Sequence, residues 1–376
     1  MKHLKVIISG GGTGGHIFPA IAIAKELEIS LHHVDILFVG AKDRMEMQKV
    51  PESGYNIEGL WISGLTRSNI FNYSFFSFFT VKNLLFPFKL LFSLRRSKNI
   101  IKRFKPDLVI GTGGFASGPL LYVANRQDIP TIIQEQNSYP GITNKLLSKG
   151  VHKICVAYDN MDKFFPISKI VFTGNPIRKE ILNFQDKRKE GRSFFGIENK
   201  NITVLVVGGS LGAKTINDSI NSNLEYFKNN HLNLIWQTGV SYDDRAKKSV
   251  KDLNYKGVRS YKFINRMSLA YAAADIIVSR AGAIAISELC FVGKPVILVP
   301  SPNVAEDHQT KNAQSLVNKN SAIMVKDIES RLKLVEEIKM LSENKILQRE
   351  LSNNIKELSV KDAASKIVDL SLELLK

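Results

Sequence analysis

The sequence predicts an α/β protein made of two doubly wound domains, and three observations support this fold class. Short apolar runs rich in β-branched residues alternate with helical periods along the whole chain, as in parallel sheets that helices cover on both faces. A buried strand, a glycine turn and a helix start occur together twice, in VIISGGGTGGH at 6–16 and VLVVGGSLGAK at 204–214. The length of 376 residues, 44% of them hydrophobic, is enough for two or three domains.

The expected strands follow one another along the chain. The first domain should contain KVIIS, DILFVG, DLVIG, TIIQEQ, KICVAY and KIVFTG, and the second ITVLVVGG, NLIWQTG, YKFI, DIIVSR, PVILVP and AIMV. Pro176 disfavours helix at Asn175 directly after a strand, so we place the joint there, with domains at 1–176 and 177–356 whose binding edges face a cleft. Residues 357–376 have a helical pattern and should form a helix that packs back on the first domain.

The charge balance favours anionic partners. Lys and Arg number 52 against 35 Asp and Glu, a formal net charge of +17, which suits phosphate esters, nucleic acid or an anionic membrane surface. A general abundance of lysine would give the same excess without such a partner. The chain has two cysteines, Cys155 and Cys290, and its start lacks the long apolar core of a secretion signal, so we expect a cytoplasmic protein without disulfides.

Three glycine turns follow predicted strands: GGGTGG at 10–15, GTGGFASGP at 111–119 and GGSLGA at 208–213. A helix that starts behind such a turn presents unpaired backbone N–H groups, for which phosphate is a natural ligand. A tight strand-to-helix connection is the alternative explanation of each turn. The spacing of the first turn also fits a dinucleotide site, but the second strand ends in LFVGA without the acidic residue that would hold the ribose, which argues against a nicotinamide nucleotide.

His16 is the candidate general base. It falls in the first turn of the first predicted helix, where the partial positive charge of the helix end disfavours protonation. A mostly neutral imidazole beside a glycine turn can take a proton from a substrate hydroxyl. A histidine that only packs or caps the helix is the other interpretation.

The stretch from Ile70 to Leu94 predicts membrane contact. It holds eight of the 21 phenylalanines, is interrupted by charged residues and should be kinked or ended at Pro87, so it is a poor spanning segment. Basic residues flank it, which is typical of a surface that lies in the headgroup layer of an anionic membrane. An ordinary core helix is the alternative. The residues expected to contact the membrane are Phe75, Phe76, Phe78, Phe79, Lys82 and Lys89.

Polar residues of the second half fit a nucleotide site. In RAGAIAISE, Glu288 lies about two turns into a helix that follows a strand, and its carboxylate could accept both ribose hydroxyls, unless it is a solvated helix residue. Arg178 could donate two parallel bonds to a diphosphate. The segment EDHQTKNA offers His308 and Gln309 at a helix start, where an ordinary polar loop is the alternative. No pattern has metal-ligand spacing, so we expect no metal and no cofactor, and cationic side chains with helix ends would stabilise a departing diphosphate.

Taken together, the motifs resemble those of one family. The segments GGTGGHIFPA, GTGGFASGP, QEQN, TGNPIR, GGSLGA, RAGAIAISE and EDHQTKNA are similar in order and spacing to the bacterial peptidoglycan glycosyltransferases of the MurG family, from Ile8 to about Ala313. The resemblance implies a GT-B fold and an inverting, metal-independent transfer of N-acetylglucosamine. The donor would be UDP-N-acetylglucosamine and the acceptor lipid I, the undecaprenyl-diphosphate-linked N-acetylmuramoyl pentapeptide. Lipid II would be made by a peripheral enzyme on the cytoplasmic side of the cell membrane.

The resemblance also implies roles for individual residues. His16 would be the base, and the acceptor diphosphate would meet Gly113, Gly114 and Ser117. The implied substrate contacts are Thr13, Gly14, Gly15, Asn137, Arg178, Ser210, Ile264, Ala283, Ile284, Ala285, Ile286, Ser287, Glu288 and Gln309. Of these, Asn137 and Gln309 would touch the donor sugar, Arg178 and Ser210 its diphosphate, Ile264 the uracil through its backbone, and Glu288 the ribose.

The chain departs from the family pattern at Ala281 and Ala285, where a serine and a threonine are usual. Backbone groups would have to replace any hydroxyl contacts at these two positions. The membrane stretch is also richer in phenylalanine than the family pattern leads us to expect.

Two other functions compete with this interpretation. A UDP-N-acetylglucosamine 2-epimerase would share the two-domain plan and the donor, but it has no lipid acceptor and no use for the stretch at 70–94. A non-catalytic basic protein would account for the net charge but not for His16 or the three glycine turns. We see no RNA-binding motif with interleaved aromatic residues, so we expect no nucleic-acid partner.

Overall fold

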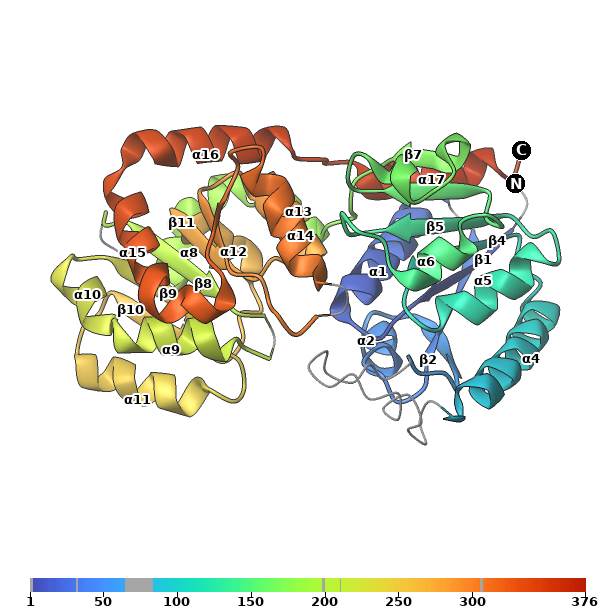
Figure 1. Cartoon of the computed structure of the whole chain (residues 1–376), viewed down its shortest axis with the longest axis horizontal. Helices are drawn as coiled ribbons and strands as arrows, with labels where there is room; N and C mark the ends of the chain where they lie inside the picture. The colour runs from blue at the N-terminus through green and yellow to red at the C-terminus, as the bar shows by residue number, and fades with distance from the viewer. Residues whose placement is uncertain (1–2, 32, 65–83, 198–199, 210, 305–306) are drawn as a thin grey trace. The chain divides into compact units, whose positions relative to one another are not determined.

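The computed structural model describes residues 3–31, 33–64, 84–197, 200–209, 211–304 and 307–376, and the chain divides into two units. Unit 1 comprises Met1–Ile177 and Asp362–Lys376, and unit 2 comprises Arg178–Lys361. Each unit is a parallel sheet with helices packed on it, and the strand order changes direction at the first strand of each sheet (Figure 1). The predicted fold class of two doubly wound α/β domains is therefore confirmed.

Unit 1 contains a sheet with the strand order β3-β2-β1-β4-β5-β6-β7. The inner strands are rich in apolar residues because both faces are covered: Val6 and Ile8 of β1 pack into one core, and Ile7 packs into the other. The described strands are β1 (Leu4–Gly10), β2 (Val34–Ala41), β3 (Asn56–Leu60), β4 (Leu108–Gly113), β5 (Thr131–Glu135), β6 (Lys153–Val156) and β7 (Ile170–Phe172).

The helices of unit 1 divide between the two faces of its sheet. One core is closed by α4 (Phe86–Phe104), α5 (Ser117–Asn125) and α6 (Ile142–Leu147). The other core is closed by α1 (Gly14–Ser30), α2 (Glu46–Glu52) and the last helix of the chain, α17 (Ala363–Glu373). Ile367 and Val368 of α17 are fully buried in this second core, where α17 lies against α1.

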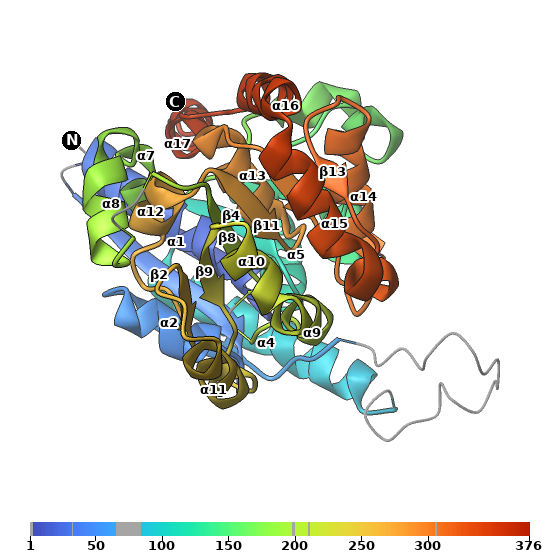
Figure 2. The ribbon, with the colours of Figure 1, turned by 90° about the vertical axis from the view of Figure 1, so that its left-hand side faces the viewer.

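Unit 2 has the strand order β10-β9-β8-β11-β12-β13. Its main core surrounds the buried Trp236 and Phe227 and is closed by α9, α10, α11 and α15, whereas α12 packs against α8 and β8 (Figures 1 and 2). The described strands are β8 (Thr203–Val207), β9 (Asn233–Gln237), β10 (Val258–Tyr261), β11 (Ile276–Ser279), β12 (Val296–Leu298) and β13 (Ile323–Met324). The helices are α7 (Lys179–Leu182), α8 (Arg188–Phe194), α9 (Lys214–Ser222), α10 (Leu224–Asn229), α11 (Asp243–Leu253), α12 (Met267–Ala273), α13 (Ala283–Val292), α14 (His308–Val317), α15 (Ser330–Glu343) and α16 (Lys345–Glu357).

Three local predictions differ from the structure. The edge strand β3 was not expected, because Glu58 and Gly59 interrupt its apolar pattern and only β2 pairs with it. The expected strand YKFI lies too late in the chain: β10 ends at Tyr261, and its pairing with β9 starts at Val258. Pro87, expected to kink or end a helix, lies in the first turn of α4, where its missing N–H is not needed, so it does not interrupt α4 itself.

Candidate active site

The first candidate site lies where the strand order of the unit 1 sheet changes direction. β1 and β4 are neighbours whose following segments lead to opposite edges, so the loops at their carboxyl ends border a crevice. α1 has Thr13 as its N-cap, and His16 lies in its first turn, as the sequence predicts. Within the described part of the chain, no hydrogen bond engages the backbone N–H groups of Thr13, Gly14 and Gly15. These amides are available to an anion.

The imidazole of His16 is held by oxygen atoms from two neighbouring strands. Its Nδ1 lies 2.8 Å from the carbonyl oxygen of Thr112 in β4 and 3.0 Å from Oε1 of Gln136, which follows β5. Gly113 makes room for the ring, since a Cβ there would come within 2.9 Å of its Cε1 and Nδ1 atoms, and the φ of +95° also favours glycine. Part of the second glycine turn therefore serves the histidine itself.

Two buried carboxylates brace the loops around His16. Glu46 of α2 accepts hydrogen bonds from the backbone N–H groups of Gly12 and Ala41, both at 3.0 Å. Glu135, at the end of β5, accepts from the N–H and side-chain amide of Asn137 and from Asn144 and Gly141, at 2.9 to 3.1 Å. Glu46 thus fixes the first glycine turn, and Glu135 fixes the loop that carries the predicted sugar contact Asn137.

The hydroxyl of Ser117, a residue predicted to meet the acceptor diphosphate, has its hydrogen-bond partners inside unit 1. Its side chain is fully buried in the first turn of α5, and its Oγ lies 2.8 Å from the carbonyl oxygen of Ser9 and 2.9 Å from that of Gly113. A hydroxyl bonded inward in this way joins β1 to the second glycine turn and does not face a phosphate. Gly114, at a φ of +87°, also serves packing, because a Cβ there would collide with the backbone of Gly11.

The corresponding edge of unit 2 carries a bidentate ion pair. Nε and Nη2 of Arg178 lie 2.7 and 2.8 Å from the carboxylate oxygens of Glu288 in α13, and the hydroxyl of Tyr271 lies 3.3 Å from Glu288 Oε2. Burial by itself would lower the pKa of Arg178, but the bonds and charge of Glu288 outweigh it and raise that pKa. Glu288 is buried and is not the solvated helix residue that was the alternative. Arg178, predicted to contact the diphosphate, and Glu288, predicted to contact the ribose, therefore contact each other.

Glutamine side chains join the loops at the same edge of unit 2. Oε1 of Gln237 accepts from the backbone N–H of Ile264, and its Nε2 donates to the carbonyl oxygen of Gly209, both at 2.9 Å. A backbone contact between Ile264 and uracil would therefore use the carbonyl oxygen or displace Gln237. Gln309, in the first turn of α14, accepts from the N–H of Ser301 at 2.9 Å, which fixes its amide next to the loop after β12.

The start of α13 lies at the point where the strand order of the unit 2 sheet changes direction. Gly282 is its N-cap, so residues 283–288, which the sequence assigns to the nucleotide-sugar, form its first two turns. Because alanines stand at 281 and 285, the backbone provides the polar groups there. Arg280, directly after β11, reaches the carboxylate of Asp327 at 2.5 Å and the carbonyl oxygens of Val299 and Pro300 at 3.0 and 3.1 Å, which ties the ends of β11 and β12 together.

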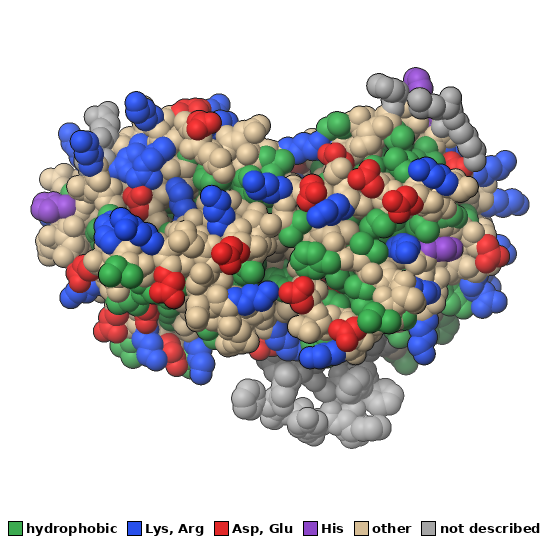
Figure 3. Space-filling view, turned by 90° about the horizontal axis from the view of Figure 1, so that it is seen from above, with side chains coloured by type: hydrophobic (Ala, Val, Ile, Leu, Met, Phe, Trp, Pro, Cys, Tyr) green, Lys and Arg blue, Asp and Glu red, His purple; other side chains and the backbone are tan. Residues whose placement is uncertain are grey.

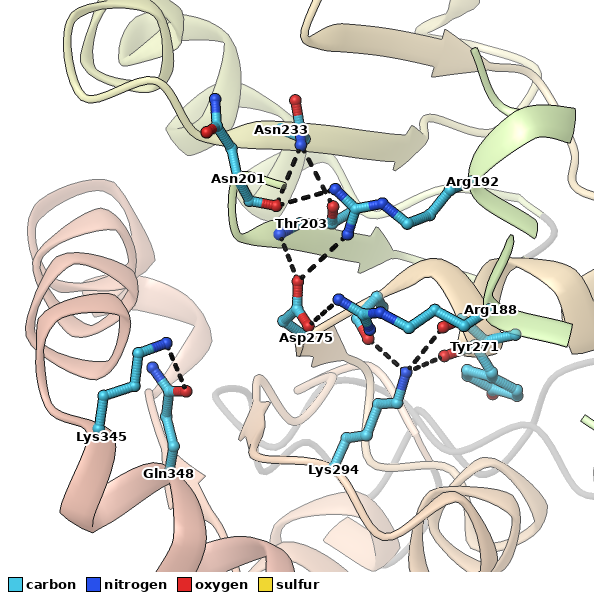
Figure 4. Close-up of polar contacts among 12 residues, drawn as sticks. Arg188, Arg192, Asn201, Thr203, Asn233, Tyr271, Asp275, Lys294, Lys345 and Gln348 are labelled. Carbon is cyan, nitrogen blue, oxygen red and sulfur yellow. Dashed lines mark hydrogen bonds and ion pairs between the residues drawn. The ribbon is translucent and has the colours of Figure 1, made fainter. Parts of the chain in front are cut away.

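A second group of polar contacts in unit 2 lies around Asp275 and Lys294. Asp275, just before β11, accepts from the N–H of Thr203 at 2.9 Å and from Arg188 at 2.7 Å, and Lys294 donates to backbone carbonyls at the end of α12, that of Tyr271 among them (Figure 4). Burial lowers the pKa of Lys294 to about 8. The network fixes α12, the helix from which Tyr271 contacts Glu288.

Several predicted site residues lie outside the described part of the chain, namely Ser210, Phe75, Phe76, Phe78, Phe79 and Lys82. Lys89 is described: its Nζ lies 3.0 Å from Oγ of Ser63 and 5.5 Å from the ring centre of Trp61. Lys and Arg side chains are spread over the face drawn in Figure 3, interspersed with acidic ones. Among the described residues there is no group of three potential metal ligands, and none of the described helices is long and apolar enough to cross a membrane.

Family models for the glycosyltransferase family 28 N-terminal domain and C-terminal domain match residues 6–156 and 203–367. The chain belongs to glycosyltransferase family 28. A relative from Flavobacterium psychrophilum, named UDP-N-acetylglucosamine--N-acetylmuramyl-(pentapeptide) pyrophosphoryl-undecaprenol N-acetylglucosamine transferase, is 52% identical over 377 residues, which cover 100% of this chain and 98% of the relative. The predicted enzyme class, a glycosyltransferase, is confirmed.

Solved structures agree with this family. The crystal structure of MurG from Acinetobacter baumannii is similar over 98% of this chain and 99% of that one, with a TM-score of 0.78 and 28% identity. The predicted resemblance to the MurG family and the GT-B type of fold are thus confirmed. A UDP-GlcNAc 2-epimerase from Neisseria meningitidis has a TM-score of 0.67 at 16% identity, over 98% of this chain and all of that one, a likeness that extends to the fold alone.

Several residues of these sites were not predicted from the sequence. Gln136 stands in the quoted motif QEQN, and its place directly after a buried strand was a usable signal. Gln237, at the end of the predicted strand NLIWQTG, had the same signal. Glu46 and Tyr271 offered none, because each reaches its partner from a separate element of its unit.

Proposed function

We propose that this chain transfers N-acetylglucosamine from UDP-N-acetylglucosamine to the muramoyl 4-hydroxyl of lipid I, which gives lipid II and UDP. One observation carries the proposal: in a family 28 chain, His16 lies at the switch point of unit 1 with Nδ1 against two oxygen atoms, at 2.8 and 3.0 Å. The name of the full-length relative supports the same donor and acceptor.

The reaction is a single displacement with inversion at the anomeric carbon. The 4-hydroxyl oxygen of the acceptor sugar forms a bond to C1 of N-acetylglucosamine while the bond from C1 to the diphosphate oxygen breaks. Nε2 of His16 takes the hydroxyl proton, and UDP leaves with the electron pair. A correctly placed general base contributes about 10²- to 10⁴-fold to such a step.

The substrates bind through anion-binding and hydroxyl-binding groups. The N–H groups of Thr13, Gly14 and Gly15, at the positive end of α1, bind the acceptor diphosphate. In unit 2, the guanidinium of Arg178 turns to the donor diphosphate while Glu288 accepts from the ribose hydroxyls. Asn137 and Gln309 touch the donor sugar. Arg178 and the helix ends stabilise the leaving diphosphate, so the transfer needs no divalent ion.

The enzyme acts as a peripheral protein on the cytoplasmic side of an anionic membrane. Support comes from α4, whose Ile100 and Ile101 enter the core, while Phe88, Leu91 and Phe92 remain exposed at helical spacing, with Phe88 66% exposed. Lys89 and the basic residues that follow lie on the same helix.

Transfer of labelled N-acetylglucosamine to a lipid I analogue in the presence of EDTA tests the enzymatic part. His16→Ala should lower kcat by about 10²- to 10⁴-fold with an unchanged KM for the donor, because only the base is removed. His33→Ala, an exposed histidine of the same unit, is the control. Full turnover by His16→Ala, or complete loss of transfer with EDTA, would contradict the proposal.

Co-sedimentation with vesicles that contain anionic lipid tests the membrane part. Phe88→Ser with Phe92→Ser should weaken binding severalfold, because apolar area leaves the lipid contact. Leu332→Ser with Ile346→Ser, which changes exposed residues of unit 2, should bind like the wild type. Equal binding by all three proteins would contradict the assignment of α4.

A further inference from the structure

We infer that Gln136 is a positioning residue that, with the carbonyl of Thr112, fixes His16 in the tautomer with hydrogen on Nδ1, so that Nε2 is the proton acceptor. The inference rests on the proposed function in one respect, that His16 is the base. The remaining steps follow from hydrogen bonds within unit 1.

The orientation of the Gln136 amide follows from its surroundings. Its Nε2 lies 2.7 Å from the carbonyl oxygen of Thr112 and 3.1 Å from that of Gln134, and it also bonds Oε1 of Gln134. All three neighbours are acceptors, so the NH₂ group must point at them. With the amide turned by 180°, an oxygen would face three oxygens. Oε1 of Gln136 is therefore the atom that faces His16.

The tautomer of His16 follows from the orientation of Gln136. Both groups within hydrogen-bond distance of Nδ1, the carbonyl oxygen of Thr112 and Oε1 of Gln136, accept only. Nδ1 must therefore carry hydrogen. A neutral imidazole carries hydrogen on one nitrogen, so Nε2 keeps its lone pair. A free imidazole in water prefers the opposite tautomer, in which Nε2 is blocked.

Buried amides hold Gln136 in turn. Nε2 of Gln134 donates to Oδ1 of Asn175 at 2.8 Å, and Nδ2 of Asn175 donates to the backbone carbonyl of Gln136 at 3.0 Å. We call Gln134, Gln136 and Asn175 the amide network; each member is at most 2% exposed. A buried polar network with its donors and acceptors paired is rigid, since each lost bond leaves a costly unpaired group.

The chemical consequence concerns the charge on the base. Catalytic histidines often have a carboxylate at Nδ1, which stabilises the imidazolium. Here Nδ1 faces a neutral amide and a carbonyl, which fix the ring without adding negative charge beside it. The amide network thus sets which ring nitrogen accepts the proton and adds no charge beside the imidazole.

Nitrogen NMR of the ¹⁵N-histidine-labelled protein tests the tautomer directly. The chain has seven histidines, so the His16 signals are assigned by their absence in His16→Gln. We expect a shift typical of N–H for Nδ1 and of a bare ring nitrogen for Nε2 in the free enzyme. The opposite assignment in the wild type would overturn the inference, and this measurement requires no altered residue in the network.

Kinetics test the consequence for catalysis. Gln136→Leu should lower kcat roughly tenfold to a hundredfold, with donor and acceptor KM within about twofold, and its His16 signals should move toward averaged values as the ring is released. Gln127→Leu, the same change at an exposed site of unit 1, should match the wild type in both measurements. Wild-type kcat with unmoved signals in Gln136→Leu would overturn the positioning role. If His16→Ala kept its turnover, the proposed base would fail while the tautomer measurement still stood.

Discussion

The two switch-point edges stabilise their functional groups in different ways. In unit 1, His16 is held by a neutral amide and a carbonyl, and the carboxylates of Glu46 and Glu135 accept from N–H groups. In unit 2, arginine side chains form ion pairs with carboxylates, in Arg178–Glu288 and Arg280–Asp327. We call the unit 1 edge neutral because its described carboxylates accept from uncharged N–H groups, and the unit 2 edge ionic because its carboxylates pair with arginines.

The difference fits what each edge has to do. A base must be uncharged before it accepts a proton, and the two groups at Nδ1 of His16 hold the ring without placing a charge there. In the proposed function Arg178 receives a diphosphate, and its bidentate pair with Glu288 fixes the direction of the guanidinium. The two edges can be distinguished by substitutions that remove a charge from each.

The largest effect is expected at the ionic edge. Glu288→Gln should lower the free energy of unfolding by about 3 kcal/mol, at the low end for breaking a buried pair because Arg178 keeps partial contact with water, and should also raise the donor KM. Denaturant unfolding measures the first effect. Glu180→Gln removes the exposed partner of the same arginine and should cost about 0.5 kcal/mol or less. Equal losses in the two variants would show that burial does not distinguish the pairs.

A smaller effect is expected when a carboxylate of the neutral edge is changed. Glu46→Gln keeps the shape but turns an NH₂ group toward one of two backbone N–H groups, which should cost about 1–3 kcal/mol. The acceptor KM should rise while the donor KM stays constant, because Gly12 belongs to the unit 1 turn. Glu52→Gln, on the exposed end of α2, serves as the control for both measurements. Unchanged stability would mean that Glu46 does not brace the turn.

Gly113→Ala separates backbone strain from contact with the histidine. The positive φ should cost about 1–2 kcal/mol, and kcat should also fall because the new Cβ displaces the imidazole. Gly54→Ala has a similar φ with open space around it, so it should lose stability but keep kcat, and Gly141→Ala should keep both. Thermal unfolding and initial rates measure the two quantities. Normal kcat in Gly113→Ala would contradict the close fit of the ring.

A further prediction concerns the pH dependence of unit 2. The pKa of Lys294 is about 8 in the folded chain, against 10.5 ordinarily, so the unfolded chain binds more protons between these values. The contribution of this group to the free energy of unfolding should therefore rise with pH between about 8 and 10. Lys294→Met should lack this rise, whereas Lys339→Met, on the exposed face of α15, should retain it. Urea unfolding at several pH values measures this rise. Parallel curves of unfolding free energy against pH for the wild type and Lys294→Met would contradict the prediction.

The fold was largely predictable because both sheets are covered on two faces. Strands such as β1 and β8 appear as continuous apolar runs followed by glycine, a pattern that few other structures produce. The position of His16 followed from the same local pattern, since a helix start is encoded within a few residues. β3 was not predicted because an edge strand needs less apolar character than an inner strand.

The contacts of the site were not predictable in the same way. Glu46 reaches a glycine 34 residues away, Gln136 reaches a histidine 120 residues away, and Arg178 meets Glu288 across 110 residues. Side-chain partners at such separations depend on how the strands are ordered, which the local pattern does not record. For the same reason Ser117 looked like a phosphate ligand, although its hydroxyl turns inward to β1.

The position of α17 has a consequence for the order in which the chain folds. During synthesis the amino-terminal strands leave the ribosome first, yet Ile367 and Val368 fill the back of their core. The earliest unit to be made is therefore completed only after unit 2, and until α17 is released from the ribosome the apolar side of α1 stays exposed to water. A ribosome that stalls before α17 is released holds a molecule whose second unit is complete and whose first unit lacks part of its core.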